Sequence, residues 1–162
     1  MKPRRKYALP AEADRRLRAR WAKGWLSVGC GFPVIALVAV LGRGFVSEPM
    51  KWAVDIASVG LMLFMIQRFS ADMAKERLEI GRKAVADRRF EEAFAALEPF
   101  TRLGNRSFDG TGEGHYLLWR AASEVGEDDL AAHCLRFLAR NRRGEWADRA
   151  RKKLKRAKRG GS

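Results

Sequence analysis

The side chains that could perform chemistry are few and scattered along the 162-residue chain. The two histidines, His115 and His133, lie 18 residues apart, and neither an HExxH motif nor a closely spaced cysteine pair accompanies them. Zinc sites need three or four such ligands grouped together, so the sequence predicts no metal site. A nucleophilic pair of Cys134 and His115 stays open as an alternative, but no residue pattern orients it.

Acidic residues offer two further possibilities. Asp55 lies within an apolar stretch, where an acid is a functional candidate by default, although it stands near the end of that stretch and can reach water. The glycine-rich segment 104–114 contains Asp109 and Glu113 but lacks the regular series of oxygen ligands of a calcium loop. It also lacks a GxxxxGK[ST] phosphate loop, so we interpret it as a flexible connector. We therefore expect no enzyme, no cofactor and no small-molecule substrate.

Two long apolar stretches dominate the first half of the chain. Residues 25–41 (WLSVGCGFPVIALVAVL) carry no charge, and residues 52–69 (WAVDIASVGLMLFMIQRF) carry only Asp55 and Arg68. Each is just long enough to cross a bilayer as a helix. One such stretch could be a buried core helix or a signal peptide, but two in close succession predict a transmembrane hairpin over residues 25–69. We expect small residues to let its helices approach closely: Ser27, Gly29 and Gly31 on the first and Ala53, Ala57 and Gly60 on the second.

The distribution of charge orients this hairpin. Residues 1–24 form a basic arm with nine Lys or Arg and two acids, and residues 68–89 hold seven Lys or Arg and four acids. The connector 42–51 holds two basic residues and one acid. The positive-inside rule then places both termini in the cytoplasm. The Arg- and Ala-rich composition favours a bacterial source, so the plasma (inner) membrane is the expected location. Cys30, in the membrane, could not form a disulfide with a cytoplasmic Cys134.

A helical cytoplasmic domain is predicted over residues 70–158, followed by a flexible tail, 159–162. Because no proline occurs between Trp52 and Ala86, we expect the second span to continue into the first helix of this domain, at about 71–86. A second helix follows the charged turn 87–89; Glu98 and Pro99 fall near its end, and Gly104 is expected to terminate it. Apolar residues at helical spacing predict three more, at about 113–125, 128–140 and 145–158. The expected fold class is all-α, with about five cytoplasmic helices.

The first two of these helices carry a recognisable pattern of small and large residues. Ile80 and Gly81 stand on the first helix, and Phe90, Ala93 and Leu97 follow on the second. This arrangement resembles a tetratricopeptide repeat, in which small residues let paired helices lie close together. A second unit resembles it more loosely, through Leu118, Gly126, Ala131 and Leu135.

The resemblance is incomplete. Trp119 replaces the glycine of the first helix in the second unit, Asp128 replaces the aromatic residue, and Ala93 to Ala131 is 38 residues where the family repeats about every 34. A generic helical bundle is the alternative. The resemblance implies antiparallel helix pairs stacked in a right-handed solenoid, a non-catalytic adaptor role, and a last helix that acts as a polar cap.

The carboxyl-terminal segment is strongly basic. Between Arg140 and Arg159 stand eleven Lys or Arg and two acids, and such runs contact phosphates or anionic surfaces. No aromatic residue in the last 13 positions could stack on bases, so nucleic acid is not the expected partner. If this segment binds a polyanion, the residues expected to contact it are Arg149, Arg151, Lys152, Lys153, Lys155 and Arg156.

Together these patterns favour a membrane-anchored helical-repeat scaffold or accessory subunit that mediates protein–protein interaction at the cytoplasmic face. Membrane lipid and another protein, or a larger membrane complex, are the expected partners. The alternative is a membrane-bound polyanion binder that uses its basic termini to contact anionic lipid or, with less support, nucleic acid.

Overall fold

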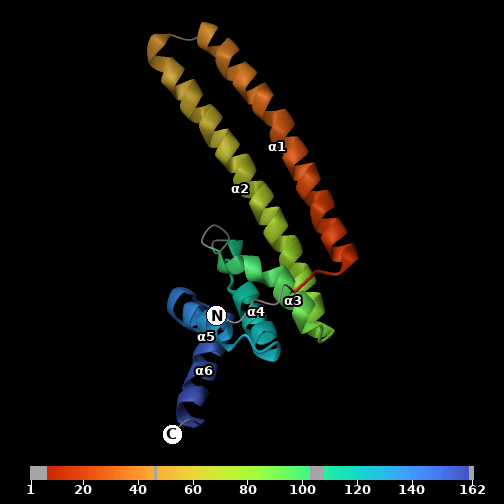
Figure 1. Ribbon diagram of the computed structural model, residues 1–162. Coiled ribbons are helices and arrows are strands. Elements are labelled where there is room, and N and C mark those ends of the chain that lie inside the picture. The colour runs from red at the N-terminus through yellow and green to blue at the C-terminus, as the bar shows by residue number, and fades with distance from the viewer. Residues whose placement is uncertain (1–6, 46, 103–107, 161–162) are drawn as a thin grey trace. The chain divides into compact units, whose positions relative to one another are not determined.

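The computed structural model describes residues 7–45, 47–102 and 108–160, and over these residues the chain is helical without a strand. Figure 1 shows the order of the helices along the chain. The chain divides into two compact units. One comprises Arg15–Met73, and the other comprises Met1–Asp14 together with Ala74–Ser162. The all-α fold class is confirmed.

The unit Arg15–Met73 is built from α1 (Ala11–Phe45) and the first part of α2 (Glu48–Ala86). The two helices run antiparallel, since the contacted residue number on α2 falls as that on α1 rises. A Cβ added at Gly24 would overlap the ring of Phe69, and one added at Gly31 would lie 2.8 Å from Cε of Met65. Of the three glycines expected at this contact, only Gly31 has the second helix within 4 Å, since Gly29 and Gly60 face open space.

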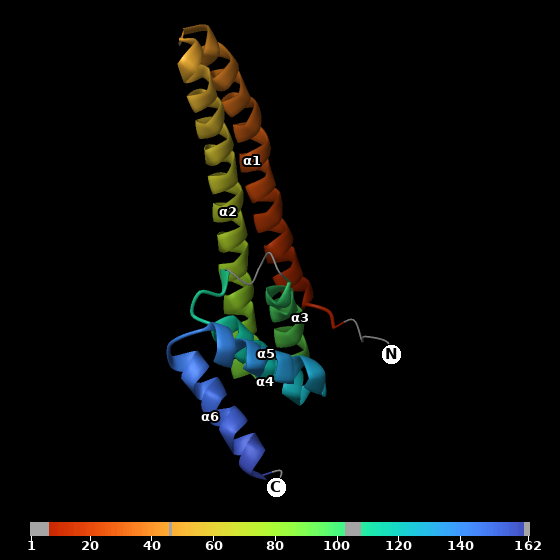
Figure 2. The same cartoon turned by 90° about the vertical axis from the view of Figure 1, so that its left-hand side faces the viewer.

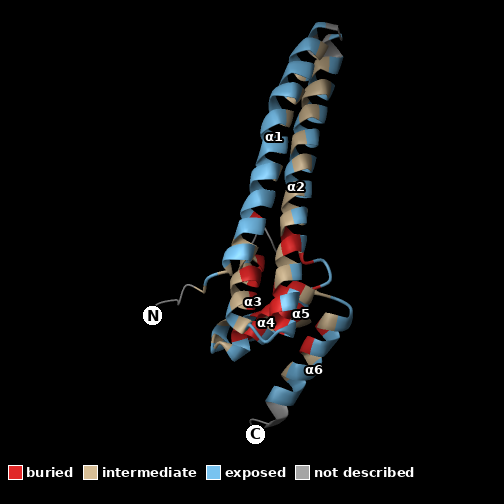
Figure 3. Ribbon diagram, turned by 90° about the vertical axis from the view of Figure 1, so that its right-hand side faces the viewer, coloured by how far each residue is buried: buried red, intermediate tan, exposed pale blue. Residues whose placement is uncertain are grey.

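Both helices expose apolar side chains along most of their length. The large apolar side chains that are exposed in the described residues all lie between Trp21 and Ile66, and Leu26 and Val40 are each 67% exposed. In Figure 3, pale blue, which marks exposed residues, recurs along both helices. Each helix is long and apolar enough to cross a membrane, and its most apolar window has no buried residues. A core helix of a soluble protein would bury that window.

The second unit contains the end of α2, α3 (Phe90–Leu97), the 3₁₀ turn η1 (Glu98–Thr101), α4 (Glu113–Glu124), α5 (Asp128–Asn141) and α6 (Glu145–Gly160). α3 packs on α4, α4 on α5, and α5 on α6 (Figure 2). The helix starts expected near 113, 128 and 145 are confirmed, and α2 does continue unbroken to Ala86.

The second helix of this unit is shorter than the sequence predicted. α3 gives way at Glu98 to the 3₁₀ turn, which contains Pro99. Proline has no N–H for the next α-helical hydrogen bond and disfavours helical geometry at the residue before it, so the α-helix ends there. Gly104, the predicted terminator, lies outside the described residues.

Close packing joins the end of α2 to α3. A Cβ added at Gly81 would stand 2.5 Å from Cγ of Leu97, whose side chain is fully buried. The turn between the helices is closed by the Arg89 N–H, which donates to the carbonyl of Ala84 at 2.7 Å, and Arg88 takes the left-handed conformation at φ 59°. The backbones of the two helices can therefore approach only because position 81 has no side chain.

Candidate functional site

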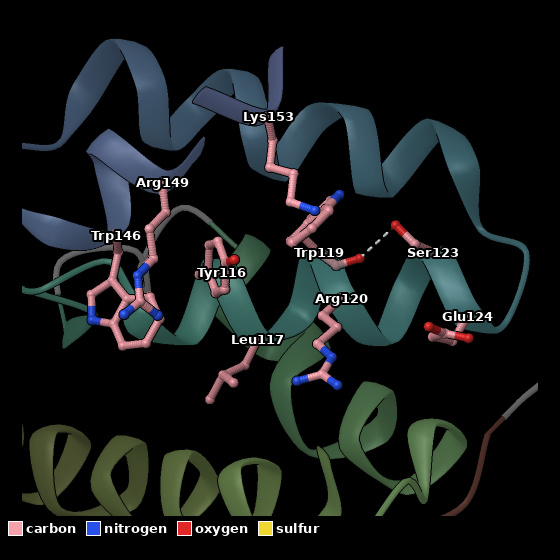
Figure 4. A pocket seen from close by; sticks show the side chains of 9 residues that line it. All are labelled: Tyr116, Leu117, Trp119, Arg120, Ser123, Glu124, Trp146, Arg149 and Lys153. Carbon is pink, nitrogen blue, oxygen red and sulfur yellow. Dashed lines mark hydrogen bonds between the residues drawn. The ribbon is translucent and has the colours of Figure 1, made fainter. Parts of the chain in front are cut away.

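An open groove lies between α4 and α6 (Figure 4). Its volume is about 590 Å³. It combines aromatic and charged side chains: Tyr116, Leu117, Trp119, Arg120, Ser123, Glu124, Trp146, Arg149 and Lys153. All of these residues belong to the unit that contains Ala74–Ser162.

Helical periodicity puts these side chains on facing stripes. Tyr116, Trp119 and Ser123 are three or four residues apart on α4, and Trp146, Arg149 and Lys153 are spaced likewise on α6. Residues at this spacing share one face of a helix. Tyr116 and Trp119 also pack, together with Leu154, against a small core of Leu135, Leu138 and Ala150.

The aromatic rings of the groove contact one another at an angle. The Tyr116 ring lies 5.1 Å from that of Trp119, with 55° between the ring planes, and 4.9 Å from that of Trp146, with 42° between them. Tilted rings are a favourable arrangement because the positive edge of one meets the negative face of the other. Tyr116 thus links the aromatic residues of α4 and α6 into one cluster.

Two cations of α6 lie over the faces of these rings. Cζ of Arg149 is 4.6 Å from the centre of the Trp146 ring, and Nζ of Lys153 is 5.6 Å from that of Trp119. Both distances are within the range of a cation–π interaction. Arg149 also pairs with Glu145, one turn earlier on the same helix. One face of the Trp146 ring and one face of the Trp119 ring are therefore each covered by a cation.

The six predicted polyanion-contact residues fall into three groups. Arg149 and Lys153 line the groove. Arg151 instead reaches back toward α5, donating to the carbonyl oxygens of Ala139 at 3.2 Å and Arg142 at 2.9 Å. The remaining three are exposed and do not line the groove: Lys152, Lys155 and Arg156.

The residues predicted to pack the repeats are found mainly in the core. Ala93, Leu97 and Leu118 are fully buried, and Ala131 and Leu135 are at most 9% exposed. Ile80 and Phe90 are partly buried against the same cluster. Gly126 has a φ of 78°, as a left-handed turn residue requires. The core also includes Ala96, Val85 and Ala147, which the repeat pattern did not single out.

A second polar feature is buried beside α4. The side chains of Asp109 and His115 are each only 1% exposed. One carboxylate oxygen of Asp109 accepts the N–H of Gly114 at 3.0 Å, and the other accepts the backbone N–H of His115 at 2.8 Å and lies 2.5 Å from its Nδ1. The His115 ring stacks on Phe137 at 4.5 Å. Asp109 thereby binds the unpaired N–H groups that every helix start exposes.

These contacts determine the ionisation of Asp109. Burial by itself would raise the pKa of this carboxyl, but the hydrogen bonds from the His115 side chain and from the backbone of His115 and Gly114 outweigh it and hold the pKa below its usual value. The expectation that 104–114 is simply a flexible connector is wrong for its second part, since Asp109 fastens that part to α4. Residues 103–107 lie outside the described part of the chain.

The other side chains that could take part in chemistry form no site within the described residues. Cys134 is fully buried in the core and Cys30 is exposed. Asp55 is partly buried on α2. No group of three or more His, Cys, Asp or Glu side chains within the described ranges could hold a metal ion. Comparison of the chain with protein-family models, curated proteins and solved structures found no match.

Proposed function

We propose that the protein is a membrane-anchored helical scaffold or accessory subunit that binds another protein at the cytoplasmic face of the plasma (inner) membrane. The anchor would be the hairpin of α1 and α2, whose apolar side chains face outward and need a non-aqueous environment. The excess of Lys and Arg in residues 1–24 and after the second apolar stretch favours a cytoplasmic location for both termini.

The packing of the second unit supports a tetratricopeptide-like arrangement of helix pairs. In the first pair, Gly81 permits contact with Leu97; in the second, the small residue Ala131 is buried. In this proposal α6 is the capping helix, with Ala147 and Ala150 buried and most of its basic residues in solvent. Repeat stacks of this type are adaptors rather than enzymes, and they need neighbours or a cap for stability.

The observation that most favours protein binding is the groove between α4 and α6. Tyr116, Trp119 and Trp146 gather there at the surface, beside Arg149. Tyrosine, tryptophan and arginine are the residues most enriched where binding energy concentrates in protein interfaces. A second candidate function, binding of a polyanion, is favoured by the exposed Lys152, Lys155 and Arg156 of α6.

Purification of the full chain from membranes in neutral detergent tests this function, with cross-linking in intact cells to identify the partner and a sample without cross-linking for the salt wash. We expect one protein partner at a fixed stoichiometry that survives a high-salt wash in neutral detergent. Recovery of anionic lipid or nucleic acid alone, lost steeply as salt rises, would favour the polyanion binder because such binding rests on charge.

The topology has its own test. With Cys30 and Cys134 replaced by serine, a thiol introduced as Ser47→Cys should react with an impermeant reagent outside intact cells, and one introduced as Ala157→Cys should not. Both positions are exposed in the structure, so burial would not explain a difference. Labelling of Ala157→Cys alone would reverse the proposed orientation.

A further inference from the structure

We infer that the groove between α4 and α6 binds an extended acidic segment of the partner protein, in which acidic residues alternate with apolar ones. The inference rests on the proposed function and adds to it the place of binding and the chemical class of the bound segment. In this arrangement carboxylates of the segment contact Arg149 and Lys153, and apolar side chains contact the cluster of Tyr116, Trp119 and Trp146.

The charge of the groove selects an acidic ligand. Its lining contains three cations, Arg120, Arg149 and Lys153, and a single carboxylate, Glu124. The whole chain has a formal net charge of +14, so the surrounding field also attracts anions. Even with the ion pair between Arg149 and Glu145 counted, the three cations outnumber the nearby carboxylates.

The spacing of the two α6 cations fits an extended chain. Arg149 and Lys153 are four residues apart on one helix, which corresponds to a rise of about 6 Å along its axis. In an extended peptide, side chains on the same face are two residues apart and separated by about 6.6 Å. Alternate acidic residues therefore match these two cations, and the intervening residues remain free to make other contacts.

The ring geometry disfavours nucleic acid as the occupant. Bases bind single-strand-binding proteins by stacking on exposed aromatic faces. Here Arg149 covers one face of the Trp146 ring and Lys153 covers one face of the Trp119 ring. Aromatic edges, in contrast, carry the positive end of the ring quadrupole, so tilted rings suit a carboxylate-bearing ligand.

The size of the groove also suits a short peptide stretch. Pockets for compact ligands measure about 300–1,000 Å³, and this groove measures about 590 Å³ and is open to solvent. Arg149 and Lys153 are already oriented by their rings, so less conformational entropy is lost when a ligand binds them.

The test is a binding titration on the full chain in neutral detergent. The probe is a fluorescein-labelled peptide in which Glu alternates with Leu, measured by anisotropy at physiological ionic strength against an otherwise identical peptide with Gln for Glu. The groove variant is the double substitution Arg149→Glu and Lys153→Glu. The matched control is Lys152→Glu and Arg156→Glu, which makes the same change in net charge on exposed residues of the same helix outside the groove.

We expect the Glu peptide to bind and the groove variant to weaken it about tenfold or more, since each lost ion pair and each new repulsion contributes up to a few-fold. The control should weaken binding by less than about threefold, because Lys152 and Arg156 do not line the groove and their charges act mainly through the screened field. Trp146→Leu should also weaken binding, since it removes the ring that orients Arg149. Burial of the Cys134 thiol checks that each variant is folded.

Three results would overturn the inference: equal weakening by both double variants, equal affinity for the Glu and Gln peptides, or competition by single-stranded DNA or anionic vesicles that depends on Arg149 and Lys153. Failure of the proposed function would look different. If a cross-linked protein partner is still recovered with the groove variant, the scaffold function stands and the groove assignment falls. If the peptide result holds and no partner is recovered from membranes, the groove assignment stands and the scaffold function falls.

Discussion

Gly81→Ala should destabilise the helical unit through one contact. The added methyl group would lie 2.5 Å from Cγ of Leu97, 2.6 Å from its Cδ2 and 2.7 Å from its Cδ1. Favourable carbon–carbon contacts lie at about 3.5–4.0 Å. The Leu97 side chain is fully buried and has no free space to enter, so α2 and α3 would have to separate by roughly 1 Å.

Two opposing effects set the magnitude. Overpacking of a core typically costs about 1–3 kcal/mol, whereas alanine is favoured over glycine within a helix by about 1 kcal/mol. The net loss of unfolding free energy is therefore about 0–2 kcal/mol. The helix contact is tested by how this loss changes when Leu97 is shortened. Leu97→Ala removes all three contacting atoms. In that background Gly81→Ala should instead stabilise the unit by up to about 1 kcal/mol.

The assay should follow this unit and not the apolar helices. In a Cys30→Ser background, the only thiol is that of Cys134, which is fully buried in the core. Its reaction with a maleimide during urea or thermal titration in detergent reports opening of the unit. A coupling free energy of about 1–3 kcal/mol between positions 81 and 97 is expected. The same effect of Gly81→Ala in both backgrounds would refute the close helix contact.

Two further predictions use the same assay. Ala93→Leu should lower the unfolding free energy by about 1–3 kcal/mol because Ala93 has no exposed surface, whereas Ala132→Leu, at an exposed position of α5, should change it little; equal tolerance would contradict the packing. Asp109→Asn should cost about 1–3 kcal/mol at neutral pH. Because the folded-state pKa of Asp109 is lowered, its contribution to the unfolding free energy is present above about pH 4 and is lost as pH falls through the folded-state pKa. The stabilities of wild type and variant should therefore converge in acid. A stability difference that does not change with pH would contradict this role of the ionised carboxylate.

Much of the helical unit was predictable from local sequence signals. Apolar residues at helical spacing placed three helices within one or two residues of their observed ends, and Gly81, a small residue of the pattern, lies where α2 contacts Leu97 of α3. These features depend on neighbours in the chain, and local periodicity records them. The early end of α3 was also encoded locally, in Pro99, but the prediction gave that proline less weight than the later Gly104.

The buried pair Asp109–His115 was missed for a different reason. Its loop is rich in glycine, which is typical of flexible connectors, and the prediction followed composition. The available signal was an acid a few residues before a helix start, where carboxylates bind unpaired N–H groups. Whether such an acid is buried depends on what covers it. Here Phe137, from the next helix, stacks on His115, and that contact is not visible in a local pattern.

The groove shows why the sequence of the basic helix α6 did not by itself reveal which residues surround it. The absence of aromatic residues in the last 13 positions argued against stacking with bases, yet α4 places Trp119 beside Lys153, 34 positions later in the chain. The fold divides the basic residues of α6 into two that line the groove, one that packs on α5, and others that are exposed outside the groove. Either exposed group would make binding depend on salt, so salt dependence cannot identify the residues that contact the partner. Variants with equal charge change inside and outside the groove can, because only Arg149 and Lys153 lie against the aromatic cluster.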